Sequence, residues 1–249
     1  MKFTRLFQKI FAVITIISCA NICNANQKQY DQGAKFYEQG IEAYQKGNWN
    51  DASQLFENAL DNFKKSIGEK HPHTLLSMNN LALTYRLLGR NTEALVLSEN
   101  VYKLNQSIRG EEHLETLTSM NNLAGAYYSN GRVKEALALL EKLAKISISN
   151  LGENHPATLL IINNQAESLR VLGRNAEALA LNEKVLSKSR ELLGERHPNT
   201  LLSMSNLAEL NRVLGRNNEA LTLDKDALQI RSEVLGDKHP DNLTSMNNL

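Results

Sequence analysis

The sequence predicts an all-α fold, a solenoid of stacked antiparallel helix pairs, on the strength of two observations. The first is composition: only 6% of the 249 residues are aromatic and four are proline. A β-sandwich would be unusual with so few of either, and the chain is too rich in Leu and Ala to be disordered. The second is a repeat of 42 residues that fills the chain from about Asn26 onward. A fixed period of this length is typical of stacked supersecondary units.

Residues 1–25 are predicted to be a secretory signal peptide and are set apart from the fold. Three basic residues precede an apolar run at 10–17, and small or polar residues follow up to Ala25. The apolar run is about half of the ~20 residues that a bilayer-spanning helix needs. We therefore expect an exported protein, periplasmic or extracellular, with no transmembrane span after processing.

Two processing routes are compatible with this segment. Ordinary signal peptidase would cut after Ala25, whereas 16–19 resembles a bacterial lipobox in which Cys19 becomes a lipid anchor. The polar stretch at 21–26 favours ordinary cleavage, and a membrane-anchored lipoprotein is the alternative. Cys19 and Cys23 both precede the favoured cut. The processed chain then has no cysteine, which excludes a disulfide framework and thiol catalysis.

The charge balance argues against nucleic acid as a partner. Removal of Lys2, Arg5 and Lys9 lowers the number of basic residues from 28 to 25, against 27 acidic ones. The processed chain is therefore weakly acidic, without the basic excess that binding to phosphates needs.

The repeat predicts where the structural units begin and end. Five full units are expected at 26–67, 68–109, 110–151, 152–193 and 194–235, and a truncated sixth at 236–249. Each unit is expected to hold two helices, because neither helix could bury its apolar stripe alone.

Residue types at the ends of the helices mark the boundaries within a unit. In the second unit, Pro72 and Thr74 open the first helix and Gly89 ends it in a left-handed conformation. Asn91 is expected to cap the second helix, with Glu93 in its first turn. The first helix is expected to make apolar contacts through Leu75, Leu76, Met78, Leu81, Ala82, Tyr85 and Leu88.

Small residues at fixed spacing identify the type of repeat. The small position of each first helix is occupied by Gly40, Ala82, Ala124, Ala166 and Ala208, followed by Gly seven residues later and Ala twelve residues later. Together with the phrases at 151–159 and 121–124, this pattern resembles the tetratricopeptide repeats of kinesin light chains and their bacterial relatives. The resemblance implies a right-handed superhelix whose first helices line a concave groove for extended peptides or protein segments. The chain lacks the heptads with which kinesin light chains bind the motor subunit.

The resemblance also places candidate binding residues in this groove. Two residues before the small position lie Asn80, Asn122, Asn164 and Asn206. Asn is unfavourable inside a helix by about 0.5–0.7 kcal/mol relative to Ala, so its recurrence indicates a hydrogen-bonding role. These amides either bind the backbone of a bound peptide or bond within the stack. For the preceding asparagines, Asn79, Asn121 and Asn163, bonding within the stack is favoured.

A second candidate row lies four residues after the small position. It consists of Arg86, Tyr128, Arg170 and Arg212. Such a row could hold acidic or aromatic peptide motifs through bidentate and stacking contacts. The alternative is local ion pairing, since Glu167 and Glu209 stand three residues before two of the arginines.

Nothing in the sequence predicts a cofactor, a metal site or catalysis. Five of the six histidines recur once per repeat and are therefore a whole helix pair apart, too far to share one metal ion. Four of the five stand before proline, with Leu114 after His113 as the exception, and these histidines are expected to lie in the loops and to help the chain enter the next helix. No nucleophile elbow, phosphate-binding loop or dinucleotide fingerprint occurs.

The sequence thus favours an exported scaffold for protein or peptide binding, with no catalysis. One alternative is a self-associating array, joined through an uncapped carboxyl-terminal end, because the sixth unit stops within its first helix. Another is the repeat part of a longer protein whose enzymatic or effector domain lies beyond residue 249.

Overall fold

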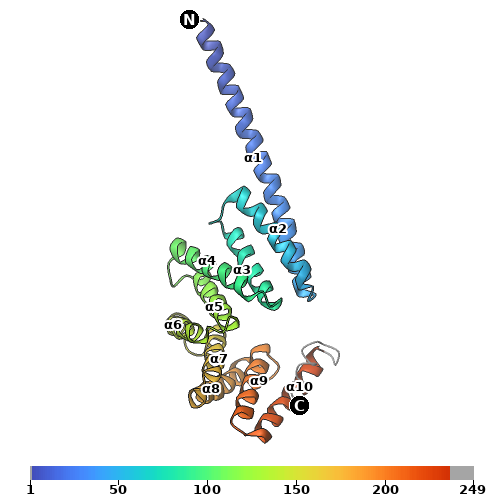
Figure 1. Cartoon of the computed structure of the whole chain (residues 1–249), viewed down its shortest axis with the longest axis vertical. Helices are drawn as coiled ribbons and strands as arrows, with labels where there is room; N and C mark the ends of the chain where they lie inside the picture. The colour runs from blue at the N-terminus through green and yellow to red at the C-terminus, as the bar shows by residue number, and fades with distance from the viewer. Residues whose placement is uncertain (1, 236–249) are drawn as a thin grey trace. The chain divides into compact units, whose positions relative to one another are not determined.

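The computed structural model describes residues 2–235, with side chains described for 24–233. This part of the chain contains ten helices and no strand, which confirms the all-α prediction (Figure 1). It divides into two compact units, Met1–Asn122 and Leu123–Leu249. The truncated sixth repeat and its proposed role in self-association lie outside the described residues.

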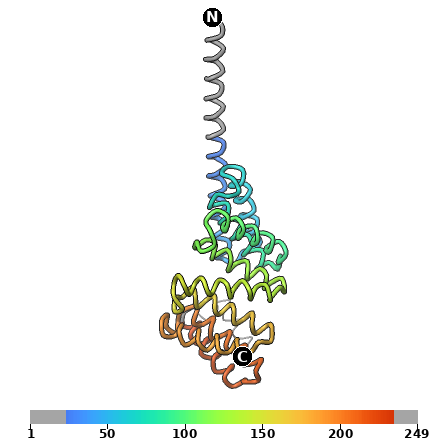
Figure 2. Tube along the Cα trace, turned by 90° about the vertical axis from the view of Figure 1, so that its left-hand side faces the viewer, coloured from blue at the N-terminus to red at the C-terminus, as the bar shows by residue number. Residues whose placement is uncertain are grey.

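Successive helices pack against one another within each unit. The first unit holds α1 (Lys2–Gln45), α2 (Trp49–Ile67), α3 (Pro72–Leu87), α4 (Asn91–Arg109) and the start of α5 (Leu114–Ser129). The second holds the rest of α5, then α6 (Val133–Leu151), α7 (Pro156–Val171), α8 (Asn175–Leu193), α9 (Pro198–Val213) and α10 (Asn217–Leu235). From α3 on, first helices of 16 residues alternate with second helices of 19 residues. Figure 2 shows the chain running back and forth within each unit.

The first helix is much longer than the others and continues through the predicted cleavage point at Ala25. Among the described residues, no helix combines the length and apolar character that crossing a membrane requires.

The turn between the two helices of a repeat forms largely as predicted, with one correction. Gly89 adopts a φ of +73°, a left-handed conformation that favours glycine. Asn91, however, is the first helical residue and not the cap. Arg90 occupies the cap with φ −79° and ψ 57°, and its carbonyl accepts the first helical bond from the amide of Ala94 at 3.1 Å. The Arg90 side chain binds Glu93, with Nη2 2.6 Å from Oε1, in place of a side-chain cap.

Histidine side chains cap the amino-terminal ends of three first helices. Nδ1 of His71 accepts a hydrogen bond from the amide of His73 at 3.2 Å, directly before the helix that starts at Pro72. The same bond joins His155 to Ala157 at 3.2 Å and His197 to Asn199 at 3.1 Å. The prediction that the histidines help the chain enter the helix is confirmed for these three. His113 instead pairs with Glu115, and His239 lies outside the described residues. Within residues 24–233, no group of three or more His, Cys, Asp or Glu could hold a metal ion.

The small position lets paired helices approach closely. Ala82, Ala124, Ala166 and Ala208 are buried at this position. Gly40 is tighter still, since a Cβ placed there would lie 2.7 Å from Cε1 of Phe56. One predicted core contact is wrong: Leu76 is 46% exposed, because it lies on a face of α3 that borders an open pocket.

Candidate functional site

The eight predicted groove residues all lie in the first helices of the repeats. Asn80 and Arg86 are in α3, and the equivalent pairs are in α5, α7 and α9. Every one of the eight is half-buried, so each side chain is packed on one side and reachable on the other. The eight are Asn80, Arg86, Asn122, Tyr128, Asn164, Arg170, Asn206 and Arg212.

In the first unit, two of the candidate amides bond to the preceding repeat. Nδ2 of Asn80 donates to the hydroxyl of Tyr37 at 2.7 Å, and Nδ2 of Asn122 donates to Oδ1 of Asn79 at 2.8 Å. Tyr37 stands one period before Asn79, so the two bonds occupy the same place in successive repeats. Bonding within the stack therefore orients at least these two amides. Burial raises the pKa of Tyr37, and the bond from Asn80 opposes this only in part.

In the fourth repeat the first asparagine is less accessible than the second, whereas both are half-buried in the second and third repeats. Asn163 is only 1% exposed, whereas its neighbour Asn164 is half-buried. Oδ1 of Asn79 accepts a hydrogen bond from Asn122 in the next repeat, whereas Oδ1 of Asn163 is buried with no hydrogen-bond partner among the described residues. The interpretation that the first asparagine bonds within the stack and only the second can face a ligand stays a prediction.

In the second unit, the Arg and Tyr row forms a ladder with carboxylates. The hydroxyl of Tyr128 donates to Oε1 of Glu167 at 2.6 Å, and Arg170 donates to both oxygens of Glu167 at 2.7 and 2.8 Å. Arg170 also approaches Glu209 at 3.7 Å, and Arg212 donates to Glu209 at 2.7 Å. The two ion pairs expected at a spacing of three residues are present, and the ladder joins them across α5, α7 and α9.

The pKa values of the ladder residues follow from burial and these bonds. Burial, together with the bond to the Glu167 carboxylate and its charge, raises the pKa of Tyr128 to about 12. Burial would raise the pKa of Glu167, but hydrogen bonds from Arg170 and Tyr128 outweigh it and lower the pKa. The bond to Glu167 raises the pKa of Arg170, which therefore stays charged. Glu167 and Arg170 therefore both stay charged across the physiological pH range.

The ladder ends in a buried carboxylate that the sequence did not predict. Asp224 of α10 is 4% exposed and binds Nη2 of Arg212. Burial raises the pKa of Asp224 despite the arginine. Periodicity gave no signal here, since the equivalent positions in the preceding repeats hold Ser98, Leu140 and Asn182.

In the first unit, Arg86 lies in a different setting. Burial lowers the pKa of Arg86, and the nearby phenol group of Tyr44 opposes this shift only in part. Arg86 differs in this from Arg170, whose pKa is raised by a directly bound carboxylate.

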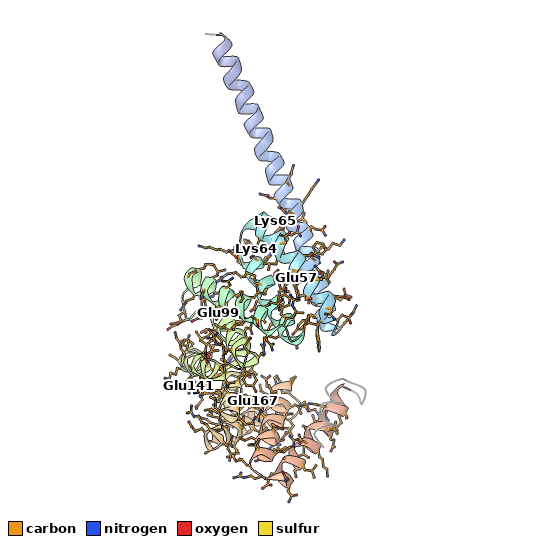
Figure 3. The ribbon with its side chains drawn as sticks, in the orientation of Figure 1. Glu57, Lys64, Lys65, Glu99, Glu141 and Glu167 are labelled. Carbon is orange, nitrogen blue, oxygen red and sulfur yellow. The ribbon has the colours of Figure 1, made fainter. Side chains whose placement is uncertain are left out.

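A second network, also absent from the prediction, links α2 to α3 and to the cap of α4. Glu57 of α2 accepts a hydrogen bond from the hydroxyl of Tyr85 at 2.6 Å, and Arg90 lies 3.5 Å from the same carboxylate. The guanidinium of Arg90 lies 3.7 Å from the centre of the Tyr85 ring. Burial and the bond to Glu57 raise the pKa of Tyr85 to about 12. Figure 3 labels Glu57 with Glu99 and Glu141, which occupy the same position one and two repeats later.

Comparison with known proteins decides the family. The family model of the tetratricopeptide repeat matches residues 43–99, 79–149, 156–223 and 203–249. The chain belongs to the tetratricopeptide repeat family. Proteins built from these repeats are generally non-catalytic scaffolds that mediate contacts with peptides and proteins.

Solved structures of tetratricopeptide repeat proteins are similar to this chain. A protein of Podosopora anserina, described as a kinesin light chain with nearly identical TPR-like repeats, is 30% identical, with a TM-score of 0.66 over 81% of this chain and 95% of its own. PlcR of Bacillus thuringiensis, solved with the peptide PapR7 and DNA, is 18% identical, with a TM-score of 0.66 over 87% of this chain and 75% of its own. The Rap regulator of plasmid pLS20, solved with the Phr* peptide, is 14% identical, with a TM-score of 0.70 over 85% of this chain and 56% of its own. A search of curated protein sequences finds no match.

The resemblance to kinesin light chain repeats is therefore confirmed, and the more distant structures share the fold. The role of the eight candidate residues in binding stays a prediction.

Proposed function

We propose that this tetratricopeptide repeat protein is an exported scaffold that binds an extended peptide or protein segment along its first helices, without catalysis of its own. The observation that carries the proposal is the placement of the eight candidate residues. All eight are half-buried on equivalent positions of the first helices, and those with described bonds are held by side chains of their own or a neighbouring repeat.

Such an arrangement suits peptide recognition because the side chains are oriented before a ligand arrives. An amide that donates through Nδ2 to a neighbouring repeat, as Asn80 and Asn122 do, keeps an oxygen that can accept a backbone N–H. Pre-oriented groups lose less conformational entropy on binding. The peptides bound by the Rap and PlcR structures support this use of the fold.

The ladder of the second unit favours a ligand with its own charges. Arg170 and Arg212 are both half-buried, and each is shared with a glutamate. A peptide carboxylate could replace Glu209, because its side chain is 47% exposed and exposed ion pairs contribute only about 0–1 kcal/mol each.

Affinity capture with paired variants tests the proposal. Partners are recovered from the native host with the intact protein and with Asn80→Ala, Asn122→Ala, Asn164→Ala and Asn206→Ala combined. We expect the variant to lose the partners that the intact protein retains. Equal recovery of the same partners would exclude a role for these amides.

Tyr37→Phe supplies the matched control. It removes the 2.7 Å hydrogen bond of Asn80, as Asn80→Ala does, but leaves the amide on the helix face. Capture should therefore fall strongly with Asn80→Ala and only slightly with Tyr37→Phe, which loses the pre-orientation of the amide but keeps its donor and acceptor. If both variants lose capture equally, the amide acts through packing and not through the ligand.

Export rests on the amino-terminal pattern alone, and its test is direct. The mass of the mature protein from its native host should correspond to a chain that begins at Asn26. A lipidated chain beginning at Cys19 would support the anchored form instead. A full-length chain retained in the cytoplasm would contradict export.

A further inference from the structure

A pocket of about 260 Å³ lies in the first unit, between the starts of α3 and α5 and the end of α4. Its apolar lining includes Leu75, Leu76, Val101 and Leu114. Leu76 is 46% exposed and Leu114 is 70% exposed, so apolar surface is open to solvent at the pocket.

The repeat pattern changes at this junction. Leu114 begins α5 where α3, α7 and α9 begin with Pro72, Pro156 and Pro198. Arg109 ends α4 where α2, α6 and α8 end with Ile67, Leu151 and Leu193. His113 also departs from the other junctions, since its Nδ1 pairs with Glu115 at 2.5 Å. Several lining positions therefore differ from the rest of the array.

The preceding junction shows what fills the equivalent space. Phe63 stands one period before Asn105, is 2% exposed and packs against the rings of Tyr30 at 5.5 Å and His73 at 5.7 Å. Asn105 occupies its place at the pocket, and its shorter side chain cannot fill the space of an aromatic ring. The hollow is thus a position at which the chain itself uses a phenyl group one repeat earlier.

The polar groups of the pocket are arranged around a positive charge. Asn105 is 4% exposed; its Oδ1 accepts from Arg109 at 2.7 Å and its Nδ2 donates to the carbonyl of Glu115 at 3.4 Å. Among the described residues, no carboxylate forms an ion pair with Arg109. The one carboxylate of the lining, Glu115, is held by His113. The guanidinium of Arg109 is therefore available to an anion at an otherwise apolar site.

We propose that this pocket binds a small aryl carboxylate, with the ring in the space that Phe63 fills one repeat earlier and the carboxylate on Arg109. The volume suits a single ring with a short chain, since about 150 Å³ suffices for benzene in an apolar cavity. An arginine fork is well matched to a carboxylate. The site is distinct from the proposed peptide-binding residues and depends on none of them.

Titration of the full chain with 3-phenylpropionate, followed by calorimetry and by NMR, tests the proposal. The intact protein should bind one equivalent saturably and should bind 3-phenylpropan-1-amine, which has the same ring and the opposite charge, at least tenfold more weakly. Absence of saturable binding, or equal affinity for the amine, would overturn it.

Two variants probe the two halves of the site. Asn105→Phe should abolish binding by placing a phenyl ring in the hollow, as Phe63 does one repeat earlier. Because Leu75 stands where the first repeat has Gly33 beside Phe63, circular dichroism checks that this variant keeps its fold. Arg109→Leu, which restores the residue type of the other repeats, should weaken 3-phenylpropionate at least tenfold and the amine much less. Lys103→Leu removes a charge from the same helix outside the lining and should leave the affinity unchanged. Binding that persists in both pocket variants, or that falls equally in Lys103→Leu, would place the ligand elsewhere.

Discussion

Gly40 gives a prediction in which a residue typical of the family should destabilise the fold. The other repeats have alanine at this position, so Gly40→Ala brings the first repeat into line with them. In α1, however, the new Cβ would lie 2.7 Å from Cε1 and 2.8 Å from Cδ1 of Phe56. The aromatic ring occupies the space that the alanine would need.

The size of the effect follows from two opposed contributions. Replacing glycine by alanine inside a helix stabilises it by about 0.5–1 kcal/mol. Overpacking a core costs about 1–3 kcal/mol. We therefore expect Gly40→Ala alone to lower the free energy of unfolding by about 0–2.5 kcal/mol. The size of the side chain at position 56 should decide whether Gly40→Ala stabilises or destabilises the protein.

A double-mutant cycle isolates the clash. Phe56→Leu reproduces the pair of the third repeat, in which Ala124 and Leu140 are both buried. In this background Gly40→Ala should stabilise the protein by about 0.5–1 kcal/mol, because only the helix propensity remains. The coupling energy from urea unfolding of the four proteins should be about 1–3 kcal/mol. A coupling energy near zero would refute the close packing of Gly40 on Phe56.

Two further predictions concern titratable groups. Burial and the charge of His73 lower the pKa of His71 in the folded protein. The cap should therefore stabilise the fold fully above about pH 6.5, the ordinary pKa of histidine, and its contribution should be lost as the pH falls through the lower pKa of the folded state. Asn caps a helix without titrating, so His71→Asn is the reference. Between pH 7.5 and pH 5, the free energy of unfolding measured with urea should fall by about 1 kcal/mol more in the intact protein than in the variant. Equal losses would contradict the cap. Glu167→Gln should lower the pKa of Tyr128 from about 12 without restoring its ordinary value, because burial remains. Ultraviolet titration of the phenolate measures this, and an unchanged pKa would show that Glu167 does not bind the hydroxyl.

Features set within one repeat could be predicted from the sequence. The helix that begins at Pro72, the left-handed Gly89 and the pairing of Glu167 with Arg170 depend on residues close in the chain, where type and spacing determine the geometry. The cap at Arg90 was missed because Asn is the usual capping type, and the competing pair with Glu93 gives no capping signal in sequence.

Contacts between repeats could not be predicted in the same way. Asn122 reaches Asn79 across 43 residues, and Tyr128 reaches Glu167 across 39 residues. Such contacts depend on how far neighbouring helices slide and rotate as their cores pack. The sequence therefore shows the candidate rows as recurring positions, but not the partners in neighbouring repeats that orient them.

Photo-crosslinking from the helix face tests the central claim of peptide binding most directly. A photoreactive amino acid replaces Asn206, half-buried on first helix α9, or Ala180, exposed on second helix α8. Both proteins are irradiated in the native host, and the crosslinked peptides are identified by mass spectrometry. The account predicts that position 206 captures a defined segment of a partner and that position 180 does not. Capture of the same segments by both positions, or by position 180 alone, would contradict it.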